Sequence, residues 1–193
     1  MPSSTFLNLD NNKKNKLINA AMTYFSKCNY SDVSINQIII SAEIPRGSFY
    51  MYFKDKDDLF EYLIEVEKVK LHDAIKDILI KNNGDLYNTF SELYDVISRY
   101  IVLSDYKMMF KNVFIYFGMH KSHFEKPGSI LYENVKDLID KKNINEEELE
   151  FIFIMLVHNL FMGITYGINN DCLDNKGTYL RKLHILCYGI YKK

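Results

Sequence analysis

The chain has 193 residues, of which 48% are hydrophobic and 25% charged, and its formal net charge is −1. These values place it among ordinary soluble globular proteins with one substantial core, and they argue against a uniformly basic protein that coats nucleic acid. The three cysteines (Cys28, Cys172 and Cys187) are an odd number without paired spacing, so we expect reduced thiols in a cytoplasmic protein.

Positive charge is concentrated at the N-terminal end. Residues 1–56 contain seven Lys or Arg side chains against four Asp or Glu, and the rest of the chain is acidic. This asymmetry favours one end that faces a polyanion. A small excess of lysine is also typical of a solvated surface, so the charge pattern alone does not decide between the two.

The spacing of apolar residues predicts a nearly all-helical chain, because only three prolines and eight glycines occur and no long run alternates with period two. Residues 1–11 are polar and aperiodic, which predicts a disordered arm. The predicted helices cover residues 13–28, 35–42, 45–53, 55–82, 85–104, 106–117, 129–142, 145–169 and 178–191.

Two of these helices are short and adjacent. Ser34 and Gln37 have the spacing of a capping box at the start of the first, and Pro45 is suited to the first position of the second. Two short helices joined by a tight turn indicate a helix-turn-helix.

The second short helix has two distinct faces. At about 100° per residue, Phe49 and Phe53 fall together toward the core, whereas Gly47, Tyr50 and Met51 point the opposite way. Arg46 and Ser48 lie on the flanks of the outer face. Its bare backbone, guanidinium, hydroxyl, phenol and thioether are groups that meet phosphates, base edges and thymine methyls in a major groove.

Residues 16–65, KLINAAMTYFSKCNYSDVSINQIIISAEIPRGSFYMYFKDKDDLFEYLIE, resemble the TetR family of bacterial transcriptional regulators. The resemblance implies an all-α fold, with a helix-turn-helix DNA-binding domain at residues 12–55 and a helical ligand-binding and dimerisation domain at residues 56–193. Glu43 occupies a turn position where the family usually has glycine, and a non-glycine residue in a left-handed conformation costs roughly 1–2 kcal/mol. Ile39 and Ile40 also depart from the usual pattern.

The same resemblance implies which residues contact DNA. Arg46 would read a guanine and Met51 would touch a thymine methyl, while most of the others would hold phosphates. The full predicted set is Ser34, Asn36, Gln37, Arg46, Gly47, Ser48, Tyr50, Met51, Tyr52 and Lys56.

The C-terminal body is rich in Met and aromatic residues, which suits an adaptable apolar cavity for a small apolar or aromatic effector. For any single residue, simple core packing is the more common role. The predicted ligand-binding set is Tyr94, Met109, Phe114, Phe117, His158, Met162 and Tyr166.

The last two predicted helices are more apolar than a monomer of this size needs. The resemblance implies that they form a four-helix dimer interface, and a two-fold dimer suits a palindromic operator. The predicted interface set is Phe151, Ile154, Met155, Leu180, Leu183, Leu186, Cys187 and Ile190. We therefore expect a homodimeric, ligand-responsive regulator, more plausibly a repressor than an activator.

Other classes fit the sequence less well. His120 and His123 with Glu125 have metal-like spacing but no third ligand at a diagnostic distance, so neither a metal nor a cofactor is expected. The apolar stretch 151–168 is interrupted by His158 and Asn159, which favours a buried helix over a membrane span. A helical ligand-binding protein without specific DNA binding, or less plausibly an all-α enzyme, remains as an alternative.

Overall fold

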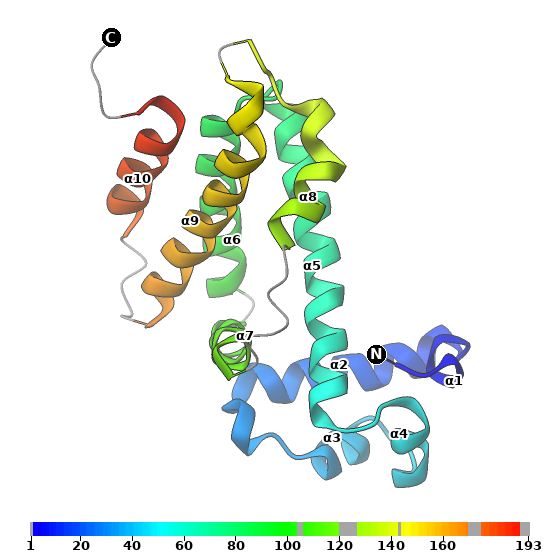
Figure 1. Cartoon of the computed structure of the whole chain (residues 1–193). Coiled ribbons are helices and arrows are strands. Elements are labelled where there is room, and N and C mark those ends of the chain that lie inside the picture. Colours follow the sequence, from blue (N-terminus) through cyan, green and yellow to red (C-terminus); the bar gives the residue numbers. More distant parts are fainter. Residues whose placement is uncertain (1, 104–105, 120–126, 143, 170–174, 190–193) are drawn as a thin grey trace. The chain divides into compact units, whose positions relative to one another are not determined.

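The computed structural model describes residues 2–103, 106–119, 127–142, 144–169 and 175–189 (Figure 1). This part of the chain contains helices and no strand, which confirms the all-α prediction. The α-helices are α1 (Ser4–Leu7), α2 (Asn11–Lys27), α3 (Ile35–Ser41), α4 (Arg46–Tyr52), α5 (Lys56–Lys81), α6 (Leu86–Leu103), α7 (Lys107–Met119), α8 (Pro127–Val135), α9 (Leu149–Asn169) and α10 (Lys176–Tyr188).

The chain divides into two compact units. The N-terminal unit comprises residues 1–70 and 105–116, and the C-terminal unit comprises residues 71–104 and 117–193. This division differs from the boundary predicted at residues 55 and 56. The start of α5 and most of α7 belong to the N-terminal unit because their aromatic side chains complete its core.

That core is largely aromatic. The ring centroid of Phe60 on α5 lies 4.5 Å from that of Phe25 on α2 and 5.3 Å from that of Tyr116 on α7. Tyr30, between α2 and α3, lies 5.0 Å from Phe60. All four residues are buried, so burial of their large apolar surfaces holds α2, α5 and α7 together.

The predicted disordered arm is wrong for residues 3–9. Ser4–Leu7 form the short helix α1, which packs on α4. Phe6 is fully buried, with its ring 4.7 Å from the ring of Phe53. Burial of the Phe6 ring against the core therefore helps to order this short segment.

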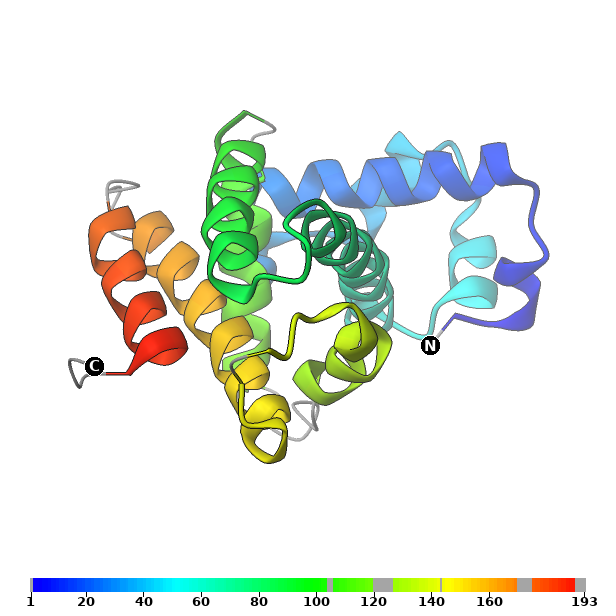
Figure 2. The same cartoon turned by 90° about the horizontal axis from the view of Figure 1, so that it is seen from above.

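In the C-terminal unit, α9 packs against α6, α8 and α10, and Figures 1 and 2 show α9 and α10 side by side. Tyr94 on α6 stacks on Tyr179 on α10 with ring centroids 4.3 Å apart, and the Tyr179 hydroxyl donates to the carbonyl of Phe90 at 2.8 Å. A Cβ at Gly163 would lie 2.9 Å from the Tyr179 ring. The absence of a side chain there lets α9 approach this stack.

Residues 146–168, which include most of α9, are long and apolar enough by length and composition to cross a membrane, with a mean hydropathy of 1.8 over the best window. The packing of α9 against three other helices is typical of a core helix.

One predicted helix end was placed differently. α5 ends next to the predicted residue 82, where Asn83 and Gly84 take left-handed conformations with φ of 53° and 81°. The helix predicted at residues 129–142 instead ends at Val135 and continues as a single 3-10 turn, Lys136–Leu138. The N–H of Asp140 then donates to the carbonyl of Gly84 at 3.0 Å, which draws the chain away from a helical path.

Candidate nucleic-acid interface

Helices α3 and α4 form the predicted helix-turn-helix, and Figure 1 shows them together on one side of α2. Ser34 is the N-cap residue of α3, but its side chain makes no capping hydrogen bond. The predicted capping box is therefore wrong at the level of side-chain contacts. α3 ends where Ala42 N–H donates to the Ile38 carbonyl at 2.9 Å.

The turn contains Glu43 in the left-handed conformation, with φ of 58°, where the TetR pattern has glycine. Lys16 on α2 donates to the Glu43 carboxylate at 2.6 Å. This hydrogen bond and the lysine charge hold the pKa of Glu43 below its ordinary value. The Glu43 carboxylate thus neutralises the positive charge of one basic side chain, Lys16, in this unit.

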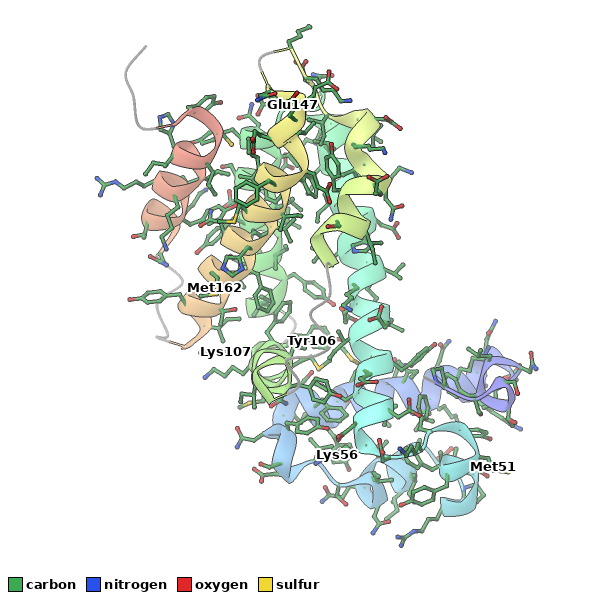
Figure 3. The ribbon with its side chains drawn as sticks, in the orientation of Figure 1. Met51, Lys56, Tyr106, Lys107, Glu147 and Met162 are labelled. Atoms are coloured by element: carbon green, nitrogen blue, oxygen red, sulfur yellow. The ribbon has the colours of Figure 1, made fainter. Side chains whose placement is uncertain are left out.

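The two faces of α4 lie as the sequence predicts. Phe49 and Phe53 are buried, whereas the side chains of Tyr50 and Met51 are 49% and 56% exposed. A Cβ at Gly47 would meet nothing within 4 Å, and Arg46 is exposed. Met51 extends away from the other N-terminal helices (Figure 3). We call the exposed surface of Arg46, Gly47, Tyr50 and Met51 the α4 outer face.

The remaining residues predicted to contact DNA differ in their exposure. Asn36 and Gln37 on α3 are exposed, while Ser34, Ser48 and Tyr52 are half-buried. Ile40, one of the two residues that depart from the usual TetR pattern, is 76% exposed. The first turn of α3 therefore offers two exposed amide side chains.

Lys56 has a structural role that the sequence did not indicate. Its Nζ donates to the carbonyl of Tyr30 at 2.8 Å, with Ser31 and Val33 carbonyls at 3.4 Å. The same Nζ lies 4.6 Å from the centre of the Tyr30 ring. The ammonium is occupied by the loop before α3, so the predicted phosphate contact at Lys56 is not supported.

Tyr30 itself donates a hydrogen bond to Asp57 in the first turn of α5. Burial and the Asp57 carboxylate raise the pKa of Tyr30 well above its ordinary value. The pKa of Tyr116 is also raised, by burial and by the Glu61 carboxylate. The Tyr116 hydroxyl donates a hydrogen bond of 2.7 Å to this carboxylate. Both phenols stay neutral donors that fix α5 in the N-terminal unit.

The C-terminal unit contains a groove of about 280 Å³ between α9 and α10. Of the seven predicted ligand-binding residues, it brings together Met162 (labelled in Figure 3) and Tyr166. The groove is lined by Asn159, Met162, Gly163, Tyr166, Asn175, Thr178, Tyr179 and Lys182.

The other predicted ligand residues lie elsewhere. Tyr94 is buried in the stack with Tyr179, and Met109 is buried within the N-terminal unit. His158 is exposed, whereas the next two residues of α9, Asn159 and Leu160, are buried. The side chains of Phe114 and Phe117 lie outside the described part of the structure.

The predicted dimer residues also separate. Phe151 is 62% exposed, and Ile154, Met155, Leu180, Leu186 and Cys187 are half-buried. Leu183 is fully buried within its own chain, so its place in the interface set is wrong. Ile190 lies outside the described residues. Ile185 and Tyr188 on α10, which are not in the predicted interface set, are also exposed, at 43% and 54%.

Among the described residues, no group of three His, Cys, Asp or Glu side chains is placed to hold a metal ion. His120, His123, Glu125 and Cys172 lie outside the described residues.

Two further residues of the N-terminal unit were missed. Ser3, whose backbone and side chain contact the carbonyls at the end of α4, was assigned to the disordered arm, although a serine before Phe6 is a weak helix-start signal. Asn112 is fully buried on α7. The only indication of this buried position in the sequence was an asparagine within a largely apolar helix.

The chain is similar to known proteins in sequence and in fold. Residues 17–63 match the family of bacterial regulatory proteins described as the tetR family. The chain is also 24% identical over 151 residues to the IcaR negative transcriptional regulator of the icaADBC biofilm operon from Staphylococcus epidermidis, which covers 75% of this chain and 78% of that protein. This similarity extends well beyond the helix-turn-helix.

Solved structures share the fold at low sequence identity. A TetR-family regulator from Pectobacterium atrosepticum superposes with a TM-score of 0.66 at 15% identity, covering 94% of this chain and 96% of that one. The regulator FadR from Bacillus subtilis, solved in complex with stearoyl-CoA, gives a TM-score of 0.53 at 16% identity, covering 91% and 98%. Residues 17–63 thus match the tetR family of bacterial regulatory proteins, and together with the curated relative and the shared fold they support a TetR-family transcriptional regulator.

Proposed function

We propose that this protein is a homodimeric, ligand-responsive repressor that binds a palindromic operator in the cytoplasm. The α4 outer face carries the proposal. In it a short helix buries Phe49 and Phe53 and presents Arg46, Gly47, Tyr50 and Met51.

Each group on this face has a role in major-groove recognition. The Arg46 guanidinium is suited to a bidentate contact with a guanine, and the Met51 thioether to a thymine methyl. Gly47 permits close approach of the backbone, and the Tyr50 hydroxyl reaches a phosphate. Asn36 and Gln37 on α3 and the half-buried Ser34, Ser48 and Tyr52 complete the proposed contact set, from which we omit Lys56.

We place the dimer interface on the exposed apolar surface of α9 and α10. Phe151, Ile185 and Tyr188 expose large apolar side chains there, and apolar side chains that gather on one exposed surface mark an interaction site. A two-fold dimer would place two α4 helices in successive major grooves about 34 Å apart, or a multiple of that distance.

For the effector we propose the groove between α9 and α10. It combines the apolar Met162 and Tyr179 side chains with the polar Asn159, Thr178 and Lys182. Its volume of about 280 Å³ lies just below the usual range of about 300–1,000 Å³, so only a small molecule would fit. Binding would release DNA if the effector has higher affinity for a conformation with a different α4 spacing.

The test is selection of duplexes from a random DNA library with the purified protein, followed by fluorescence anisotropy at fixed salt. We expect a palindromic consensus that survives competition by unrelated DNA. Tyr50→Ala and Arg46→Ala should each weaken specific binding by about tenfold or more. Tyr100→Ala, which changes an exposed tyrosine of the C-terminal unit, is the matched control.

If selection yields no consensus while the protein stays folded, the regulator proposal fails and the alternative of a ligand-binding protein without specific DNA binding takes its place.

A further inference from the structure

The recognition helix α4 cannot hold its own conformation. It has seven residues, fewer than the 12–15 or so at which an isolated helix becomes even marginally stable in water. The last four carbonyls of any helix also lack partners within it. The placement of α4 therefore depends on what contacts its end and its buried face.

Ser3 supplies partners to two of these carbonyls. Its backbone N–H donates to the carbonyl of Tyr52 at 2.9 Å, and its hydroxyl donates to the carbonyl of Met51 at 2.6 Å. The same hydroxyl oxygen accepts from the N–H of Phe6 at 3.3 Å, as the N-cap of α1. One hydroxyl thus caps the end of α4 and the start of α1 together.

Phe6 fixes this arrangement from the core side. It is fully buried, and its ring centroid lies 5.9 Å from that of Tyr52, 4.7 Å from that of Phe53 and 5.3 Å from that of Tyr62. These contacts attach the N-terminal segment to the end of α4 and to α5.

The other end of the segment is attached to α2. Lys14 donates to the carbonyl of Leu7 at 2.7 Å, and the Asp10 carboxylate accepts from the N–H groups of Asn12 and Lys13 at the start of α2. The segment therefore connects α2, which packs on α3, to the far end of α4.

We propose that residues 3–6 form a clamp that positions α4 for operator recognition, with Ser3 and Phe6 acting through α4. Met51 connects the clamp to DNA recognition directly. Its side chain lies on the α4 outer face, while its backbone carbonyl accepts the hydrogen bond from the Ser3 hydroxyl. The clamp rests on the proposed function, because it matters for recognition only if α4 reads DNA.

The clamp should affect specific and non-specific binding differently. Contacts with base edges require each side chain to be placed accurately, whereas attraction to phosphates depends mainly on charge. Loosening α4 without changing any charge should therefore lower operator affinity and leave the affinity for unrelated DNA unchanged.

The test compares Ser3→Ala with Ser4→Ala, a matched change at the next residue, which is exposed. Affinities for the selected operator and for a scrambled duplex would be measured by anisotropy at one salt concentration. We expect Ser3→Ala to weaken operator binding by about 3- to 10-fold, the equivalent of one hydrogen bond. Scrambled DNA should bind as tightly as before, and Ser3→Thr, which retains the hydroxyl, should restore operator binding.

Hydrogen exchange of the peptide that covers α4 shows whether the helix end has loosened. We expect faster exchange in Ser3→Ala than in Ser4→Ala, and the same in Phe6→Leu, which keeps an apolar side chain but loses the ring contacts. Equal ratios of operator to scrambled affinity in Ser3→Ala and Ser4→Ala would overturn the clamp, even if exchange were faster. Absence of operator selectivity in the unmodified protein would instead reject the proposed function.

Discussion

The side-chain carbonyl of Asn112 on α7 accepts a hydrogen bond of 2.8 Å from the backbone N–H of Tyr30, 82 residues away in sequence. The amide nitrogen of Asn112 also donates to the carbonyls of Phe25 and Cys28 at 2.8 and 2.9 Å. Asn112 is fully buried. One side chain therefore satisfies three backbone groups at the end of α2 and attaches α7 to the N-terminal unit.

Replacing this amide should destabilise the N-terminal unit strongly. Asn112→Ala removes the partner of a buried N–H, a buried carbonyl and a partly buried carbonyl, which we expect to lower the free energy of unfolding by about 3 kcal/mol. Urea denaturation monitored by circular dichroism measures the change. Asn15→Ala, at an exposed position of α2, is the control and should change stability by less than about 0.5 kcal/mol. Equal stability of the two variants would show that the Asn112 contacts contribute nothing.

Glu43 should reveal the cost of its left-handed conformation. Glu43→Ala and Glu43→Gly both remove the ion pair with Lys16, but only alanine keeps the steric conflict at φ of 58°. We therefore expect the glycine variant to be more stable than the alanine variant by about 1 kcal/mol. Paired urea denaturation curves compare the two directly, and a more stable alanine variant would contradict the assigned turn geometry.

Lys56 should matter for stability. Lys56→Met removes the hydrogen bonds to the carbonyls before α3 and the contact with the Tyr30 ring, so we expect the free energy of unfolding to fall by about 2 kcal/mol. Lys54→Met is the matched control, because Lys54 is an exposed lysine two residues earlier. If Lys56→Met leaves the thermal midpoint unchanged but weakens DNA binding, the original phosphate-contact prediction is correct.

The proposed dimer should dissociate when a charge is placed on its apolar surface. We expect Phe151→Glu on α9 to yield monomers at micromolar concentration in sedimentation velocity, because a carboxylate would lose its hydration in the interface. Ile130→Glu on α8 changes a similarly exposed apolar residue, 61% against 62%, and should leave the dimer intact. Dissociation by both variants, or by neither, would place the interface elsewhere.

Cys187 should react slowly with alkylating agents. Burial, together with the nearby Asp85 carboxylate, raises the pKa of the Cys187 thiol to about 12. A thiol with a raised pKa stays protonated and unreactive until the pH approaches that value, so labelling at pH 8 should be roughly 10³-fold slower than for a free cysteine. Mass spectrometry of the Cys187 peptide after iodoacetamide treatment, with and without urea, measures this ratio. Comparable labelling in both conditions would show that the thiol is not buried.

The sequence by itself determined the elements whose signals are local. The apolar spacing placed most of the helices to within a few residues, with α1 and the end of α8 as exceptions. The 100° rotation per residue separated Phe49 and Phe53 from Gly47, Tyr50 and Met51. The substitution of Glu43 for the usual glycine located the left-handed residue of the turn. These features follow from neighbours a few positions apart, so sequence spacing is sufficient to find them.

The tertiary structure alone decided the contacts between distant segments. Ser3 meets Met51 across 48 residues, Lys56 binds carbonyls about 25 residues before it, and Asn112 reaches the end of α2. The burial of Leu183 and the exposure of Tyr188 depend on how α10 rotates against α6 and α9. A polar side chain has the same identity wherever it lies, and only the packing of helices distant in sequence determines which backbone groups it satisfies.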